Sequence, residues 1–116
     1  MDKNAHMTWS DEEHGAVIAE RMYQIAGTPD GIHVRIGEPM NKEGDCACAV
    51  HIRGIDDDSV RMIFGVDALQ ALCLAIDYVS VRMHVANAQL AGDIEWLGER
   101  QLGLPPPASF RSFGEL

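Results

Sequence analysis

The chain has 116 residues, 47% of them hydrophobic, and its 9 basic and 18 acidic residues give a formal net charge of −9. This length suits one domain, and the acidity argues against nucleic acid as a partner, because a phosphate backbone needs a basic patch. No run reaches the roughly 18 apolar residues of a membrane span, so we expect no membrane partner either.

The first residues and the number of cysteines predict the cellular compartment of the protein. Residues 1–6 are polar and lack the apolar core of a signal peptide. Three cysteines, an odd number, do not favour a disulfide framework. We therefore expect a cytoplasmic protein.

The first elements in chain order are a polar tail and a predicted β-hairpin. We expect residues 1–13 to be a flexible tail, with Trp9 docking on the body. A strand over 16–26 follows, although Arg21 interrupts its apolar parity. Thr28-Pro29-Asp30-Gly31 is a turn sequence, and residues 32–37 alternate cleanly as the second strand.

The middle of the chain predicts two more strands. A polar loop over 37–45 leads to a strand over 46–53, and a hairpin loop over 54–59 leads to a short strand over 60–64. That hairpin loop holds three acidic residues that lack the alternating ligands of a calcium loop, so a solvated turn is expected: Asp56, Asp57 and Asp58.

Alternation in these strands predicts a sheet face turned to solvent. Arg35, His51 and Arg53 fall on that face and would make a basic stripe on an acidic protein. An ordinary solvated sheet face is the simpler interpretation, and a binding surface is the alternative.

The sequence from residue 65 onward predicts one long helix, over about 68–90. Asp67 suits the N-cap, Gln70 occupies the reciprocal position of a capping box, and Gly92 suits the C-terminal stop. Helical spacing predicts a core stripe of Leu69, Leu72, Cys73, Ile76 and Met83, with Val79 at its edge.

A second apolar stripe lies nearly opposite the first, and we predict that it is covered by the C-terminal arm or by a second copy of the chain. Its residues are Leu74, Tyr78, Val81 and Val85. The arm, 94–104, holds Trp96 and is expected to pack back on the domain. The proline-rich residues 105–116 are expected to be a disordered C-terminal tail.

The residue types that support catalysis or metal binding occur without a recognisable arrangement. Cys46 and Cys48 are too close in sequence for a zinc knuckle, so we interpret them as buried, with Cys73 clustering beside them. Asp77 and His84 lie along the same helix without an obvious nucleophile. We therefore expect no catalytic residues, no metal and no cofactor.

Three separated motifs resemble a family of small bacterial domains of unknown function. These are Val34-Arg35-Ile36-Gly37-Glu38-Pro39, Gly65-Val66-Asp67-Ala68-Leu69-Gln70-Ala71-Leu72, and Trp96-Leu97-Gly98 with Leu102-Gly103-Leu104-Pro105. The resemblance implies a stand-alone bacterial domain and assigns no activity or site residue.

Together these patterns predict an α+β domain over residues 14–104, with a three- or four-stranded antiparallel meander packed against one long C-terminal helix. We expect a non-enzymatic interaction module that forms a homodimer or binds a protein partner. Its surface would be the second helix stripe with Trp96, or the sheet face around Arg35, His51 and Arg53. The alternatives are an immunity-type inhibitor of a basic toxin, and a small ligand-binding protein or enzyme with a pocket between helix and sheet.

Overall fold

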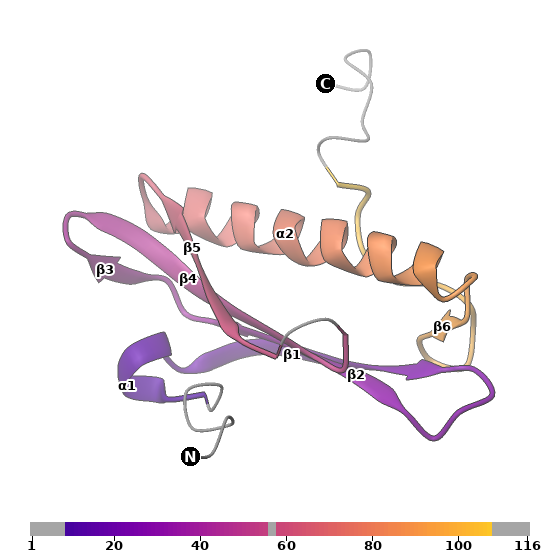
Figure 1. The fold of residues 1–116 in the computed structure, drawn as a ribbon. Helices are drawn as coiled ribbons and strands as arrows, with labels where there is room; N and C mark the ends of the chain where they lie inside the picture. The colour runs from indigo at the N-terminus through magenta and orange to yellow at the C-terminus, as the bar shows by residue number, and fades with distance from the viewer. Residues whose placement is uncertain (1–8, 56–57, 108–116) are drawn as a thin grey trace, which may run out of the picture.

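In the computed structural model, which describes residues 9–55 and 58–107, a six-stranded antiparallel sheet carries one long helix on one face (Figure 1). The described elements, in chain order, are α1 (Asp11–His14), β1 (Val17–Ile25), β2 (Gly31–Gly37), β3 (Met40–Lys42), β4 (Asp45–Arg53), β5 (Val60–Gly65), α2 (Ala68–Gln89) and β6 (Ile94–Glu95).

Strand β4 is the centre of the sheet. It pairs with β5 on one side, and on the other side with β2 through its second half and β3 through its first half. Strand β1 pairs with β2, and β6 adds two residues to the far edge of β1. The four strands expected from the sequence therefore follow one another as antiparallel neighbours, as predicted.

The predicted sheet was too small, and the helix was wrongly placed at the C-terminal end of the domain. Strand β3 forms inside the expected loop over 37–45, and β6 forms inside the expected arm, after α2. Helix α1 begins inside the expected tail, with Ser10 accepting a hydrogen bond from the Glu13 amide. The expectations for residues 1–8, 56–57 and 108–116 lie outside the described residues.

Helix α2 begins as the sequence predicts. The Asp67 carboxylate accepts a hydrogen bond of 2.8 Å from the Gln70 amide, and the Gln70 side chain in turn accepts from the Val66 amide at 2.7 Å. Gly65 is required at the preceding turn, because a Cβ there would lie 2.8 Å from the Cα of Ala71. These contacts fix where the helix leaves the sheet.

The face of α2 that meets the sheet differs from the predicted core stripe. Small residues lie against the sheet, so that the helix approaches β4 and β5 closely. Of the predicted stripe, Val79 and Met83 are buried, whereas Leu69 is 71% exposed and Cys73 is also exposed. The buried residues of α2 are Ala71, Ala75, Val79, Ser80, Met83 and Ala86.

Candidate functional site

The second stripe of α2 is partly open to solvent. Leu74 is 42% exposed and Val85 is 44% exposed, whereas Val81 is half-buried. Tyr78 is also half-buried and packs against the core beside Ile55, at the margin of β5. The stripe therefore has an apolar side chain at each end that the described residues do not cover. These two side chains are accessible to a partner.

The C-terminal arm does not cover this stripe, so the expectation that it packs over Leu74, Tyr78 and Val81 was wrong. The arm crosses the neighbouring flank of α2, where the Ser80 hydroxyl donates a hydrogen bond of 2.5 Å to the Pro105 carbonyl. Only Leu74 comes near it, at the margin of a cavity that Pro105 and Pro106 also line.

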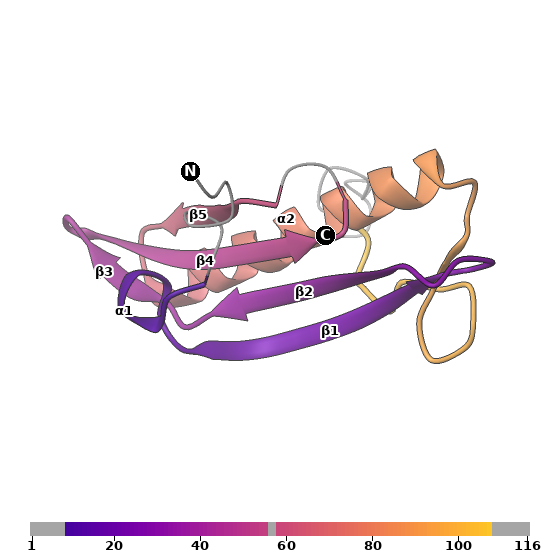
Figure 2. The ribbon, with the colours of Figure 1, turned by 60° about the horizontal axis from the view of Figure 1, so that its bottom comes forward.

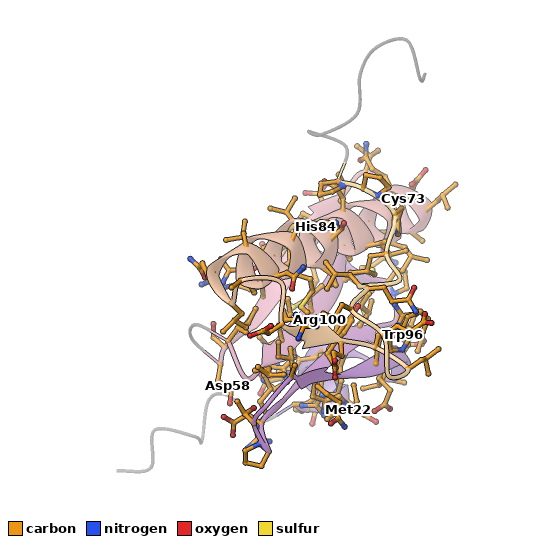
Figure 3. All side chains as sticks on the ribbon, turned by 90° about the vertical axis from the view of Figure 1, so that its right-hand side faces the viewer. Met22, Asp58, Cys73, His84, Trp96 and Arg100 are labelled. Atoms are coloured by element: carbon orange, nitrogen blue, oxygen red, sulfur yellow. The ribbon has the colours of Figure 1, made fainter. Side chains whose placement is uncertain are left out.

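Trp96 packs on Arg21 of β1. Its ring lies 3.7 Å from the Arg21 guanidinium, and a Cβ on Gly103 would collide with the ring. In Figure 3, His84 lies on the helix and Trp96 beside the sheet, with Met22 on the face away from α2. Trp96 is therefore not continuous with the exposed stripe.

The sheet face around Arg35, His51 and Arg53 is not the solvated stripe that alternation predicts. His51 is only 2% exposed, Arg35 is half-buried and Arg53 alone is exposed. The indole nitrogen of Trp9 donates to the Gly15 carbonyl, and its ring lies 5.3 Å from the Arg35 guanidinium. The predicted docking of Trp9 is confirmed, and it places the ring beside Arg35.

On this face of the sheet, His51 forms hydrogen bonds with the side chains of two other residues, Arg35 and Asp58. Arg35 can only donate, so its Nη2 donates to His51 Nδ1 at 2.8 Å, and His51 Nε2 donates to Asp58 Oδ1 at 2.7 Å. Asp58 Oδ2 also lies 3.7 Å from Arg53 Nε. Both ring nitrogens of His51 are therefore occupied by the protein itself, which suits a structural link between β4 and the loop before β5.

The other candidates for chemistry are dispersed or enclosed. His84 Nδ1 donates to the Ser80 carbonyl at 2.7 Å, so that nitrogen is not a base for the Ser80 hydroxyl. Cys48 is buried, as expected, whereas Cys46 is only half-buried and Cys73 is exposed, so the predicted burial of Cys46 and clustering of Cys73 were wrong. Burial raises the pKa of the Cys48 thiol, and neighbouring Cys46 raises it further. Such a thiol is less reactive than an ordinary one.

A cavity of about 140 Å³ lies between the helix and the sheet, as the ligand-binding alternative requires. Asp77, His84 and the cysteines do not line it, although Asp77 and Cys73 line the separate cavity beside Pro105 and Pro106. Its walls come from β1, β2, α2 and the arm, and include Ala19, Val34, Ile36, Ile76 and Leu104. The polar residues of this lining are Arg21, Tyr23 and Glu20, and the Glu20 carboxylate is bound to His33. The rest of the lining is apolar, so the cavity suits binding.

Sequence reasoning missed the residues that border this cavity, Ala19 and Arg21 on β1. The pattern did contain an indication, because Arg21 interrupts the apolar parity of its strand. The structure explains the interruption: Arg21 Nη1 donates to the carbonyls of Leu102 and Gly103, at 3.1 and 2.8 Å, and so holds the arm to β1.

Among the described residues, no helix is long and apolar enough to cross a membrane. In the same part of the chain, no cluster of three or more histidine, cysteine or acidic side chains has the geometry to hold a metal ion.

The model of one protein family, described as a domain of unknown function (DUF6968), matches residues 19–106. This match covers most of the chain, which belongs to that family. No curated protein and no solved structure matches this chain.

Proposed function

We propose that this member of the DUF6968 family is a non-enzymatic protein-interaction module that pairs with a second copy of itself through the second stripe of α2. The observation that supports this most directly is the exposure of Leu74 and Val85 on one side of a helix whose other side is packed on the sheet. Both side chains are already more than half buried, so covering the exposed remainder between two copies is favourable by roughly 1 kcal/mol each.

Substitution on the stripe tests the proposal. Val85→Glu places a charge at one end of the proposed contact, and Val85 lines none of the described cavities, so the variant is expected to stay folded. Leu97→Glu is the matched control, because Leu97 is 77% exposed and lies outside the stripe. Light scattering after size exclusion should give a dimer for the unmodified chain and the control, and a folded monomer for Val85→Glu.

A bacterial origin, which the family resemblance implies, and a cytoplasmic location, which the first residues and the cysteines predict, remain part of this proposal. The immunity-type alternative has the net charge of −9 in its favour, because a basic toxin would meet an acidic surface. The ligand-binding alternative has the cavity between α2 and the sheet in its favour.

A further inference from the structure

We infer that the outer edge of β1, together with the cavity beside it, binds an extended segment of another protein. This segment adds as a strand antiparallel to β1, and it carries an acidic residue, then any residue, then an apolar residue. The inference deepens the proposal of an interaction module, but it uses residues that the α2 stripe does not.

The first support is an open strand edge. Strand β6 covers β1 only at Gln24 and Ile25, and no other described strand lies along this edge (Figure 2). The Ala26 amide donates to Asp93 on the β6 side, whereas the Ile25 amide donates to Asp30 on the β2 side. Alternation then turns the backbone groups of Met22 and Glu20 outward. Unpaired groups of this kind hydrogen-bond an added strand.

The second support is the cavity, which lies directly inside this edge. Ala19 is exposed and faces α2, and the space beyond it is closed by Val34, Ile36, Ile76 and Leu104. Its volume is about 140 Å³. An apolar cavity of about 150 Å³ can take a benzene-sized guest. One leucine or phenylalanine side chain, entering from a strand beside Ala19, therefore fits.

The third support is the charge of Arg21. Its Nη1 is held by carbonyl oxygens, and Trp96 stacks on the guanidinium, so the side chain is fixed in position. The ion pairs among the described residues do not include Arg21. A carboxylate on the added strand, opposite Arg21, would supply the missing counter-charge.

These three features fix the order of the ligand residues. Ala19 and Arg21 both face α2 and lie at non-hydrogen-bonded positions of the open edge, where opposing side chains come closest. An antiparallel segment meets Arg21 first and Ala19 two residues later. The acidic residue must therefore precede the apolar one.

A second copy of the chain is a poorer occupant of this edge. With β6 blocking residues 24 and 25 in both copies, centred self-pairing of residues 17–23 would place Glu20 opposite Glu20 of the other copy. Like charges in directly opposed positions destabilise a strand pair. The open edge therefore favours a different protein.

The test uses fluorescein-labelled heptapeptides and fluorescence polarisation with the full chain. Ser-Thr-Glu-Thr-Leu-Thr-Ser should bind saturably. Exchanging its Glu and Leu, or replacing Glu by Lys, should weaken binding about fivefold or more. Equal binding of all three peptides, or no saturable binding of any of them up to about 1 mM, would overturn the inference.

Variants of the chain locate the site. Met22→Pro removes one outward amide without removing a bond to β2, and should weaken binding about fivefold. Ala19→Trp fills the cavity and should weaken it more than about tenfold. Met22→Ala is the control and should bind normally. Unchanged binding by both Met22→Pro and Ala19→Trp, each shown to be folded by circular dichroism, contradicts the site.

The same variants separate this inference from the proposed function. Met22→Pro should keep the dimer mass, and Val85→Glu should keep peptide binding. Loss of the dimer in Met22→Pro would instead identify the β1 edge as a self-interface and overturn the choice of partner. If peptide binding fails while the unmodified chain is still a dimer that Val85→Glu dissociates, the inference falls and the proposed function stands.

Discussion

At the scale of single residues, Asp58 holds the buried ring of His51. Removing its carboxylate takes away the 2.7 Å acceptor of the His51 Nε2 proton and leaves only the Asp58 backbone carbonyl, at 3.2 Å, in a site that is 2% exposed. We expect Asp58→Ala to lower the free energy of unfolding by about 1–3 kcal/mol, the usual contribution of a hydrogen bond to a carboxylate. Urea unfolding measures this.

Asp45→Ala is the control for that substitution, because Asp45 is exposed at the start of β4. It should change the free energy of unfolding by less than about 0.5 kcal/mol. Equal effects of the two substitutions would show that the link between His51 and Asp58 contributes nothing to stability.

Cys48 makes the stability of the fold depend on pH. Because burial raises its pKa, the folded protein keeps the thiol proton at a pH where the unfolded chain has released it. Unfolding then releases a proton, so the free energy of unfolding should fall as pH rises above the ordinary thiol pKa of about 8.5, by at most about 1.4 kcal/mol per pH unit.

The measurement is the difference in unfolding free energy between the unmodified chain and Cys48→Ala, from pH 7 to about pH 10. That difference should shrink as pH rises, because the variant lacks the thiol. Cys73→Ala, which changes an exposed thiol, should follow the unmodified chain at every pH. If the difference in unfolding free energy between the unmodified chain and Cys48→Ala does not change with pH, the raised pKa of the Cys48 thiol is contradicted.

At the scale of elements, the junction between β5 and α2 depends on close approach of two backbone segments. A Cβ on Gly65 would meet the backbone of Gln70 and Ala71, which cannot rotate away as a side chain can. Gly65→Ala should therefore destabilise the fold by about 1–3 kcal/mol or more.

Val66→Ala, one residue later, is the matched control, since Val66 is 81% exposed and its backbone bond to Gln70 is retained. Thermal unfolding of the two variants compares them directly. If Gly65→Ala unfolds at the same temperature as Val66→Ala, the junction tolerates a side chain and the tight contact is not required.

The elements that the sequence predicts well are those whose cause is local. Helix α2 begins at the expected capping residues, and β2 and β4 follow from their own alternation. Strands β3 and β6 have three and two residues, too few for a period, and exist because β4 and β1 offer them an edge.

The candidate sites were less predictable, because they depend on what covers each face. Alternation places His51 on the side of the sheet away from α2, but it does not show that Asp58 binds His51 there or that Trp9 packs beside Arg35. Periodicity finds the stripe of Leu74 and Val85. The route of the arm past Ser80, which leaves the stripe open, depends on contacts between distant residues.

At the scale of the whole molecule, the charge of −9 opposes association of two copies, whereas the apolar stripe favours it. Added salt screens the repulsion and should strengthen a homodimer. The same salt should weaken a complex with a basic partner, the immunity-type alternative, because attraction between opposite charges is screened too. The salt dependence therefore distinguishes the two kinds of partner.

The most direct test of the proposed function is the molar mass of the unmodified full chain, measured by sedimentation equilibrium over a wide range of protein concentration at low and high salt. We predict a mass that rises from one chain to two, at lower protein concentration when salt is high. A mass of one chain at every concentration and both salt levels would contradict self-association through α2.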